Sequence, residues 1–300
     1  MLKIAYAACY NHELPEGHRF PMSKYNLLYE QLLYEGTSKA ENFFEPDFRN
    51  DSFCSFAHDK EYLTKLKTLS LTSLEIRKTG FPLSKELIDR EIIITNGTLL
   101  CARHALQHGI AMNIAGGTHH AFRDRGEGFC ILNDQAVAAT NLLAEKLVFK
   151  ILIVDLDVHQ GDGTASIFQS DDRVFTFSMH GAENYPAKKE KSNLDIALPN
   201  GTDDKAYLAI LKKALPELID NFQPDFIFYQ AGVDVLATDK LGKLSLTQQG
   251  CRERDEIVLN LCKTNKIPLT ISIGGGYSER VGQIVDAHAN TFRLAQEIFF

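Results

Sequence analysis

The side chains best suited to chemistry lie in the segment 155–163, Asp-Leu-Asp-Val-His-Gln-Gly-Asp-Gly. This segment follows the run Ile-Leu-Ile-Val at 151–154, whose continuous β-branched character predicts a buried strand of a parallel sheet. Alternate residues of a strand point the same way, so Asp155, Asp157 and His159 are expected to point together beyond its end. Burying two carboxylates with an imidazole is costly unless a cation compensates them. The pattern predicts a metal site, whereas a lone Asp would more simply cap a helix.

Chemically capable residues also follow other strand-like runs. The segments concerned are His119-His120, Ser178-Met179-His180, Ala231-Gly232-Val233-Asp234 and Gly274-Gly275-Gly276-Tyr277. Open α/β sheets bind ligands outside the carboxyl ends of their strands. Five strands that deliver polar groups to one edge therefore favour an enzyme over a purely structural protein.

Strand-like and helical patterns alternate along the chain. The strand-like runs are 2–7, 111–115, 151–154, 174–178, 226–229 and 269–273, and the helical patterns are 84–107, 134–145, 203–221, 247–264 and 278–297. This alternation predicts βαβ units, with a parallel sheet covered by helices on both faces. Residues 36–83 are less regular, and residues 179–202 are predicted to form a long loop over the active face. No linker or internal repeat is visible, so we expect one domain over residues 1–300.

The composition is that of an ordinary globular protein. The chain has 300 residues, of which 44% are hydrophobic and 24% charged, and this is ample for one large core. A formal net charge of -7 provides no general attraction to nucleic acid or an anionic membrane. The six cysteines form no CxxC motif, and the chain shows neither a signal peptide nor an apolar run of about 20 residues. A cytoplasmic protein with free thiols is expected, and its oligomeric state stays open.

In five segments the sequence resembles the histone deacetylase family, which has the arginase–deacetylase fold. The segments are Gly-Gly-Thr-His-His-Ala at 116–121, Arg-Gly-Glu-Gly-Phe-Cys at 125–130, and 155–163, 231–234 and 274–277. They span most of the chain in the family's order. Gln160, the segments His18-Arg19-Phe20 and Lys24-Tyr25, and Arg254-Asp255-Glu256 are most similar to the class IV branch. The resemblance implies an α/β fold with a mostly parallel sheet of about eight strands and helices on both faces.

The same resemblance implies the metal ligands. Asp157, His159 and Asp234 are expected to bind one catalytic zinc, which leaves positions for water and substrate. This ligand set is relatively hard, so Fe(II) is an alternative. The family also binds a structural monovalent cation, K⁺ or Na⁺, and here the corresponding residues are Asp155, Asp157, His159, Ser178 and Met179. A second monovalent site is expected at Phe168, Asp171 and Val174, and His180 then needs no catalytic role.

The remaining catalytic residues are implied in the same way. His120 is expected to transfer protons, with His119 as its electrostatic partner or a second acid. Asp155 and Asp162 are the carboxylates that orient the two imidazoles. Tyr277 is expected to donate a hydrogen bond to the substrate carbonyl. The alternatives are a solvent-facing histidine in the pair, and a glycine turn followed by a half-buried tyrosine.

A substrate tunnel is also expected beside the catalytic residues. Gly128, Phe129 and Gly275 are expected to line it by resemblance, and Tyr185 is the candidate for the opposite wall. A loop Asp that binds the substrate backbone in some family members has no clear counterpart, because residues 78–84 occupy that rim. His18, Arg19 and Lys24 are expected either to line an inner acetate-release pocket or to lie at the surface.

These residues together predict zinc-dependent hydrolysis of the Nε-acyl group of lysine in a protein or peptide. Acetyl is expected to be removed. The resemblance to the class IV branch, together with Phe20 and Tyr25 near Lys24, implies that medium or long acyl chains are accepted at comparable or better kcat/KM. Three alternatives remain: a deacetylase of small amines such as polyamines, an arginase-like ureohydrolase with two metals, and a non-catalytic module that binds acyl-lysine.

Overall fold

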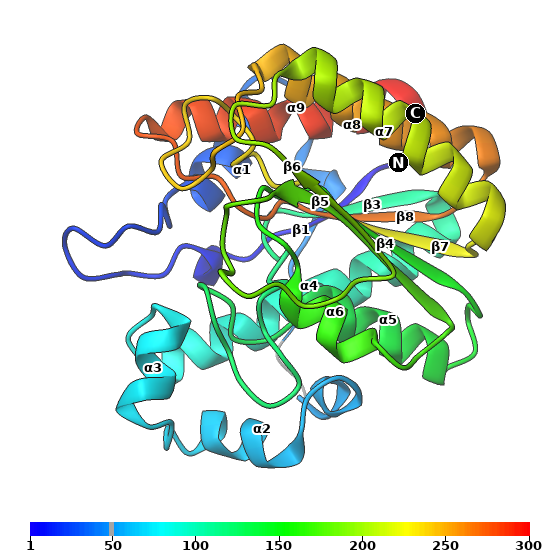
Figure 1. Ribbon diagram of the computed structural model, residues 1–300. Coiled ribbons are helices and arrows are strands. Elements are labelled where there is room, and N and C mark those ends of the chain that lie inside the picture. Colours follow the sequence, from blue (N-terminus) through cyan, green and yellow to red (C-terminus); the bar gives the residue numbers. More distant parts are fainter. Residues whose placement is uncertain (48–50) are drawn as a thin grey trace.

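The computed structural model describes residues 1–47 and 51–300 (Figure 1). Within them, eight strands form one sheet in the order β2-β1-β3-β8-β7-β4-β5-β6, and every neighbouring pair is parallel. The strands are β1 Lys3–Ala5, β2 Phe43–Phe44, β3 Ile110–Asn113, β4 Ile151–Asp155, β5 Val174–Gly181, β6 Leu194–Leu198, β7 Phe226–Gln230 and β8 Leu269–Ser272. The predicted parallel α/β sheet is confirmed.

Helices cover both faces of this sheet (Figure 1). One layer consists of α1 Lys24–Tyr34, α7 Asp204–Phe222, α8 Gln248–Asn265 and α9 Val281–Phe299. The other consists of α4 Lys85–His108, α5 Asp134–Ala144 and α6 Asp162–Phe168. The short helices α2 Lys60–Lys67 and α3 Ser73–Thr79 lie beside the second layer, at the lower left of the view. Short 3₁₀ turns occupy Ala8–Tyr10, Ala40–Asn42 and Ser52–Phe56.

The central strands are apolar because both of their faces are covered. In β4, Leu152 and Val154 belong to the core beneath α7, α8 and α9, while Ile151 and Ile153 belong to the core shared with α5. Successive side chains of a strand point to opposite faces, so a strand buried on both faces carries a continuous apolar run. Such a rigid core fixes the positions of the polar residues that follow each strand.

The segment 179–202 differs from the prediction. It contains the end of β5 and the edge strand β6, where a loop was expected throughout. In β6 the half-buried Leu194 and Ile196 alternate with the exposed Asp195 and Ala197, the period of a strand with one buried face. Residues 36–83, predicted to be irregular, include α2, α3 and β2.

Candidate active site

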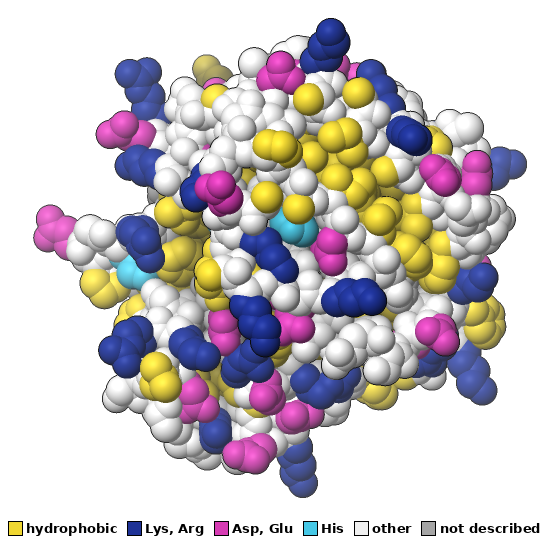
Figure 2. All heavy atoms as spheres, viewed as in Figure 1, with side chains coloured by type: hydrophobic (Ala, Val, Ile, Leu, Met, Phe, Trp, Pro, Cys, Tyr) yellow, Lys and Arg dark blue, Asp and Glu magenta, His cyan; other side chains and the backbone are white. Residues whose placement is uncertain are grey.

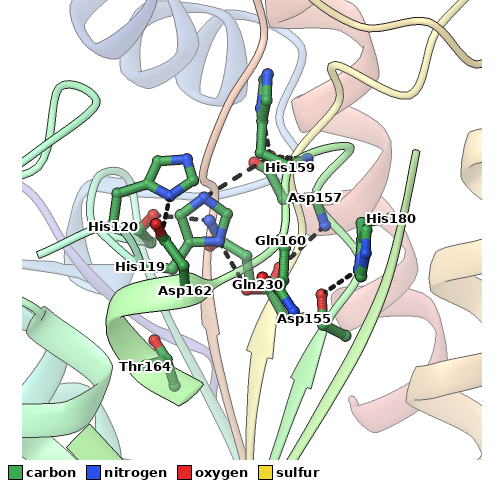
Figure 3. A network of polar contacts seen from close by, with 12 residues as sticks. His119, His120, Asp155, Asp157, His159, Gln160, Asp162, Thr164, His180 and Gln230 are labelled. Carbon is green, nitrogen blue, oxygen red and sulfur yellow. Dashed lines mark hydrogen bonds and ion pairs between the residues drawn. The ribbon is translucent and has the colours of Figure 1, made fainter. Parts of the chain in front are cut away.

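Four neighbouring strands deliver the predicted site residues to one edge of the sheet. Asp155 ends β4, and Asp157 and His159 follow it; Asp234 follows β7, the glycines and Tyr277 follow β8, and the tandem histidines follow β3. These strands are adjacent in the order β3-β8-β7-β4. Figure 3 shows the rings of His119, His120 and His159 gathered beyond the strand ends. The structure therefore brings together residues that are far apart in the sequence.

Asp157, His159 and Asp234 form a compact group of three buried side chains. Each offers one ligand atom, and these atoms all lie within 4.8 Å of one another. His159 Nδ1 lies 3.0 Å from Asp157 Oδ1 and 3.1 Å from Asp234 Oδ2. The backbone N–H groups of Val158 and Gly275 donate to the other oxygens of Asp234 and Asp157. This set of one nitrogen and two carboxylates fits a divalent metal ion.

The charges within this group require a cation. Burial and the neighbouring Asp157 carboxylate together raise the pKa of Asp234 to about 7. Burial disfavours the imidazolium of His159, but hydrogen bonds to Asp157 and Asp234 outweigh this effect and raise its pKa to about 10. Without a metal, the two carboxylates are therefore compensated by a proton on His159. A divalent metal would bind the same atoms and displace that proton.

Two glycines make room for the carboxylates. A Cβ atom added at Gly275 would overlap Asp234 Oδ2, and one added at Gly232 would overlap Asp157 Oδ2. Backbone N–H groups can approach a buried carboxylate this closely only where no side chain intervenes. The glycine of the sequence motif is thus required by the position of the acidic ligands.

The tandem histidines each pair with a carboxylate. His119 Nδ1 lies 2.6 Å from Asp155 Oδ2, and His120 Nδ1 lies 2.6 Å from Asp162 Oδ1. The centroids of the two imidazole rings are 4.1 Å apart. Both rings are buried, and a carboxylate holds the Nδ1 atom of each. The Nε2 atom of His119 lies 3.8 Å from Asp157 Oδ1, next to the residues that could hold a metal ion.

The two histidines differ in their affinity for a proton. Burial lowers the pKa of His120 to about 4, and the adjacent His119 acts in the same direction. Burial also disfavours the imidazolium of His119, but the carboxylates of Asp155 and Asp157 outweigh it and raise its pKa to about 9. In the metal-free site at neutral pH, His119 is therefore a proton donor and His120 a proton acceptor. Pairs with separated pKa values are suited to acid–base catalysis.

Tyr277 and three tunnel residues line an outer cavity of about 380 Å³, whose floor includes His120 and His159. The Tyr277 ring packs 6.0 Å from that of Phe129 and 6.5 Å from that of His159. On the other side, Tyr185 stands perpendicular to the His120 ring at 4.8 Å, and its hydroxyl donates to Glu127 Oε2 at 2.9 Å. Gly128 also lines this cavity, whereas Gly275 lines a smaller cavity deeper inside.

The inner cavity has a volume of about 40 Å³ and includes two residues that sequence reasoning missed, Arg90 and Glu91. Both are buried on α4 and form an ion pair, and Arg90 Nε donates to Tyr10 O at 2.9 Å. Arg90 Nη2 has no hydrogen-bond partner within the described residues. A charged pair inside the apolar stretch 87–94 was the signal that could have identified them.

The three residues considered for an acetate-release pocket lie elsewhere. Arg19 lines the outer cavity, and His18 Nε2 lies 2.8 Å from the carbonyl of Gly80. Lys24 is buried behind the glycines that follow β8, where its Nζ donates to Gly274 O at 2.7 Å. None of the three is among the residues that line the inner cavity, and an acetate-release role for them stays a prediction.

Two further residues hold the site together. Asp239 accepts hydrogen bonds from the backbone N–H groups of Tyr277, Leu241 and Gly242. Arg254 is fully buried and donates to the carbonyls of Leu156 and Gly232, close to the metal-binding aspartates. The turn pattern Asp-Lys-Leu-Gly at 239–242 could have identified Asp239 from the sequence. Arg254 was noted only for its resemblance to class IV.

The residues predicted for monovalent cations are close together, and cation binding stays a prediction. Asp155 and Ser178 are register partners in β4 and β5, Met179 follows, and all three are buried. Ser178 Oγ lies 2.9 Å from His180 Nδ1. The second set, Phe168, Asp171 and Val174, forms the turn between α6 and β5, in which Asp171 also pairs with Arg173.

The geometry places two oriented imidazoles and a group of three residues that could hold a metal ion at one edge of a parallel α/β sheet. Comparison with known proteins identifies the family: residues 18–292 match the model of the histone deacetylase domain. The protein belongs to the histone deacetylase family, and with it comes deacetylase activity of the hydrolase type. Membership of the class IV branch stays a prediction.

Individual relatives agree with this assignment. The chain is 43% identical over 296 residues to an uncharacterised protein of Picosynechococcus sp., covering 99% of both chains. It is 30% identical over 278 residues to histone deacetylase 2 of Arabidopsis thaliana, covering 89% of this chain and 72% of that one. With histone deacetylase 1 of Homo sapiens it shares 28% identity over 292 residues, covering 90% of this chain and 59% of the human one.

Solved structures confirm the arginase–deacetylase fold. The crystal structure of the HDA15 HD domain matches with a TM-score of 0.82 at 20% identity, over 99% of this chain and 88% of that one. None of the helices within residues 1–47 and 51–300 is long and apolar enough to cross a membrane.

Proposed function

We propose that this protein is a metal-dependent deacetylase that hydrolyses the Nε-acetyl group of lysine in a protein or peptide. One observation carries the proposal: His120, His159 and Tyr277 line both cavities, and the inner cavity is also lined by His119 and Asp157. A neutral acetyl-lysine side chain matches the outer cavity, since its aliphatic stem contacts aromatic walls and only its amide reaches polar groups.

In this proposal Asp157, His159 and Asp234 would hold the metal, zinc or alternatively Fe(II). When bound, such an ion polarises a carbonyl oxygen and lowers the pKa of a water molecule. His120, neutral and oriented by Asp162, accepts a proton from the attacking water. His119, or His120 once protonated, then gives a proton to the departing amine.

Tyr277 would donate its hydroxyl hydrogen bond to the substrate carbonyl oxygen as negative charge develops there. Burial raises the pKa of Tyr277 well above its ordinary value, so its hydroxyl keeps the proton that it donates. The backbone of the residue is fixed by Asp239, which accepts from its N–H at 2.6 Å. A fixed donor of this kind stabilises the transition state more than the ground state.

The size of the inner cavity supports acetyl as the preferred acyl group. The inner cavity, whose lining includes Asp157, His159 and Tyr277, has a volume of about 40 Å³, and a cavity needs roughly 10–15 Å³ by this measure to hold one water molecule. An acetyl methyl group fits, whereas a long hydrocarbon chain does not. We therefore propose short acyl chains, in place of the longer chains that the aromatic residues near Lys24 suggested.

Two alternatives have less support. An arginase-like enzyme needs two clustered metals, and in the described residues only Asp157, His159 and Asp234 form such a metal-binding group. A non-catalytic acyl-lysine module would have no need for two histidines held by carboxylates. We also propose that monovalent cations bind at the two predicted sets of residues and that the protein is cytoplasmic. Its partners in this proposal are acetylated proteins or peptides.

Asp157→Asn tests the metal requirement. It removes one charged ligand while keeping the volume, so we expect bound zinc to be lost and turnover of an acetyl-lysine peptide to fall by about 10²-fold or more. The matched control is Asp220→Asn at the exposed end of α7. Metal content by atomic absorption and turnover by peptide mass spectrometry provide the readouts. Full activity in verified metal-free protein would refute the mechanism.

A further inference from the structure

The entrance of the outer cavity is lined mainly by cationic side chains. Its lining includes Arg19, Arg77, Lys78 and Lys243, which are all exposed, and Glu183 as the one acidic residue. We call the four cations the cationic rim. On the face that Figure 2 shows, Lys and Arg side chains lie among Asp and Glu side chains. The chain as a whole carries a net charge of -7, so this rim opposes the overall balance.

The cationic rim is only partly neutralised. Lys78 Nζ lies 3.2 Å from Glu127 Oε1, and Lys243 Nζ lies 3.4 Å from Glu183 Oε2. Arg19 and Arg77 form no ion pair within the described part of the chain. Glu127 also accepts from Arg125 and Tyr185, so its charge is shared among several donors. The mouth of the cavity therefore retains an excess of positive charge.

The rim is attached to the tunnel by backbone hydrogen bonds. The N–H of Gly128 donates to Lys78 O at 3.0 Å, and the N–H of Phe129 donates to Thr79 O at 2.8 Å. Arg77 and Lys78 lie in the last turn of α3, whose C-cap is Gly80 with a left-handed conformation. The cations of this segment are thus held at a fixed position beside the tunnel wall.

Lys243 is positioned from the opposite side. Its backbone N–H donates to Asn184 Oδ1 at 3.2 Å, and Asn184 Nδ2 donates to Leu241 O at 2.8 Å. Asn184 directly precedes Tyr185, the other aromatic wall. Positive charge therefore flanks the tunnel from both sides.

We infer that the cationic rim selects substrates that carry a carboxylate close to the acylated nitrogen, such as peptides with acidic residues next to the acetyl-lysine. This inference rests on the proposed function. The acetyl-lysine side chain is neutral, so its own charge cannot determine selectivity inside the tunnel. Residues next to the acetyl-lysine in the peptide remain outside the tunnel, where they contact the cationic rim. At an exposed surface, the attraction between a substrate carboxylate and the rim cations is modest, and a substrate cation is repelled by a similar amount. Basic peptides and acetylated polyamines are disfavoured.

Three peptides that differ only in the neighbours of the acetyl-lysine test this inference. The flanking residues are Glu, Gln or Lys, with both peptide ends blocked. With zinc-loaded protein at low ionic strength, we expect kcat/KM for the Glu peptide to exceed that for the Lys peptide by roughly tenfold, with the Gln peptide between. Added salt should reduce the difference, because exposed charges are screened. Peptide Kd, measured by fluorescence anisotropy, should follow the same order.

Charge-removing variants assign the preference to the rim. Arg77→Gln and Lys243→Gln should each lower the Glu-to-Lys ratio of kcat/KM by about threefold. Lys213→Gln on α7 is the control with the same charge change outside the cavity lining. Equal kcat/KM and Kd for the three peptides, or a ratio that Lys213→Gln lowers equally, would overturn the inference.

A further comparison identifies the source of the carboxylate. The kcat/KM values of Nε-acetyl-lysine with a free and with an amidated α-carboxylate distinguish a small acidic substrate from an acidic peptide. If no peptide were hydrolysed but the Glu peptide still bound more tightly than the Lys peptide, the result would count against the proposed hydrolysis and support charge selection by the rim. Turnover without a charge order would support hydrolysis and overturn the inference.

Discussion

At the scale of single residues, the site works because its catalytic side chains are held by defined partners. Asp162 fixes one imidazole and Asp155 the other, while Asp239 fixes the backbone of Tyr277. Buried polar groups that lack partners are costly, and groups held by partners keep one geometry. The reactive atoms are therefore oriented before a substrate arrives, and single-atom changes should separate their roles.

Removing the hydroxyl of Tyr277 should affect the transition state and leave metal binding intact. For Tyr277→Phe we expect kcat to fall by about 10²-fold or more, with bound zinc unchanged, because the ring and its contacts with Phe129 remain. Tyr34→Phe, at a residue 95% exposed, is the control. Steady-state kinetics on an acetyl-lysine peptide give the readout. An unchanged kcat would assign Tyr277 a structural role only.

Adding one methyl group at Gly275 should disturb the metal ligands directly. Its Cβ would overlap Asp234 Oδ2 and approach Asp157 Oδ2, so Gly275→Ala should weaken zinc binding by roughly 10-fold or more. Gly282→Ala in α9 is the control, since its Cβ would meet nothing within 4 Å and should stabilise the protein by about 0.4–1 kcal/mol. Competition with a fluorescent zinc chelator measures both affinities. Equal zinc affinities would contradict the proposed ligand arrangement.

At the scale of elements, the strand ends could be predicted and the helix contributions could not. The run 151–154 and the polar residues after it follow a period that sequence reasoning detects, which is why the residues of the metal-binding group were found. Arg90 and Arg254 reach the site from α4 and α8, and their role depends on how those helices pack against the sheet. A helical period reports which face is buried but not which strand end lies opposite. The edge strand β6 was missed because its alternation is short.

Arg254 connects α8 to both strand ends that carry metal ligands. Replacing it with Met keeps the volume but leaves Asp255 buried without its cation, so Arg254→Met should destabilise the protein by about 3–5 kcal/mol. Arg252→Met is the control two residues away, since Arg252 pairs with Glu256 and Glu297 at the surface and should contribute at most about 1 kcal/mol. Urea unfolding measures both. Similar losses for the two variants would show that burial of the pair is unimportant.

At the scale of the whole molecule, stability depends on histidines that are buried without charge. His58 is 1% exposed; its Nδ1 lies 2.9 Å from Phe122 O, and its Nε2 accepts from Asn133 N–H at 2.9 Å. It joins the segment before α2 to the one before α5, and burial lowers its pKa to about 4. Because Nε2 accepts a hydrogen bond, protonation of the ring would break this connection.

The pKa of His58 sets the direction of its effect on stability. Below about pH 6.5 the unfolded chain takes up a proton on His58, whereas the folded protein does so only near pH 4, so its contribution to stability is present above pH 6.5 and is lost as the pH falls. Between about pH 7.5 and pH 5 this loss should be about 2 kcal/mol. We expect His58→Asn to reduce the pH dependence of the urea unfolding free energy by that amount, although the variant is less stable overall. The control is His108→Asn at the exposed end of α4. If His58→Asn and the unmodified protein lost equal stability on acidification, burial of a neutral His58 ring would be excluded as a cause of the pH-dependent loss of stability.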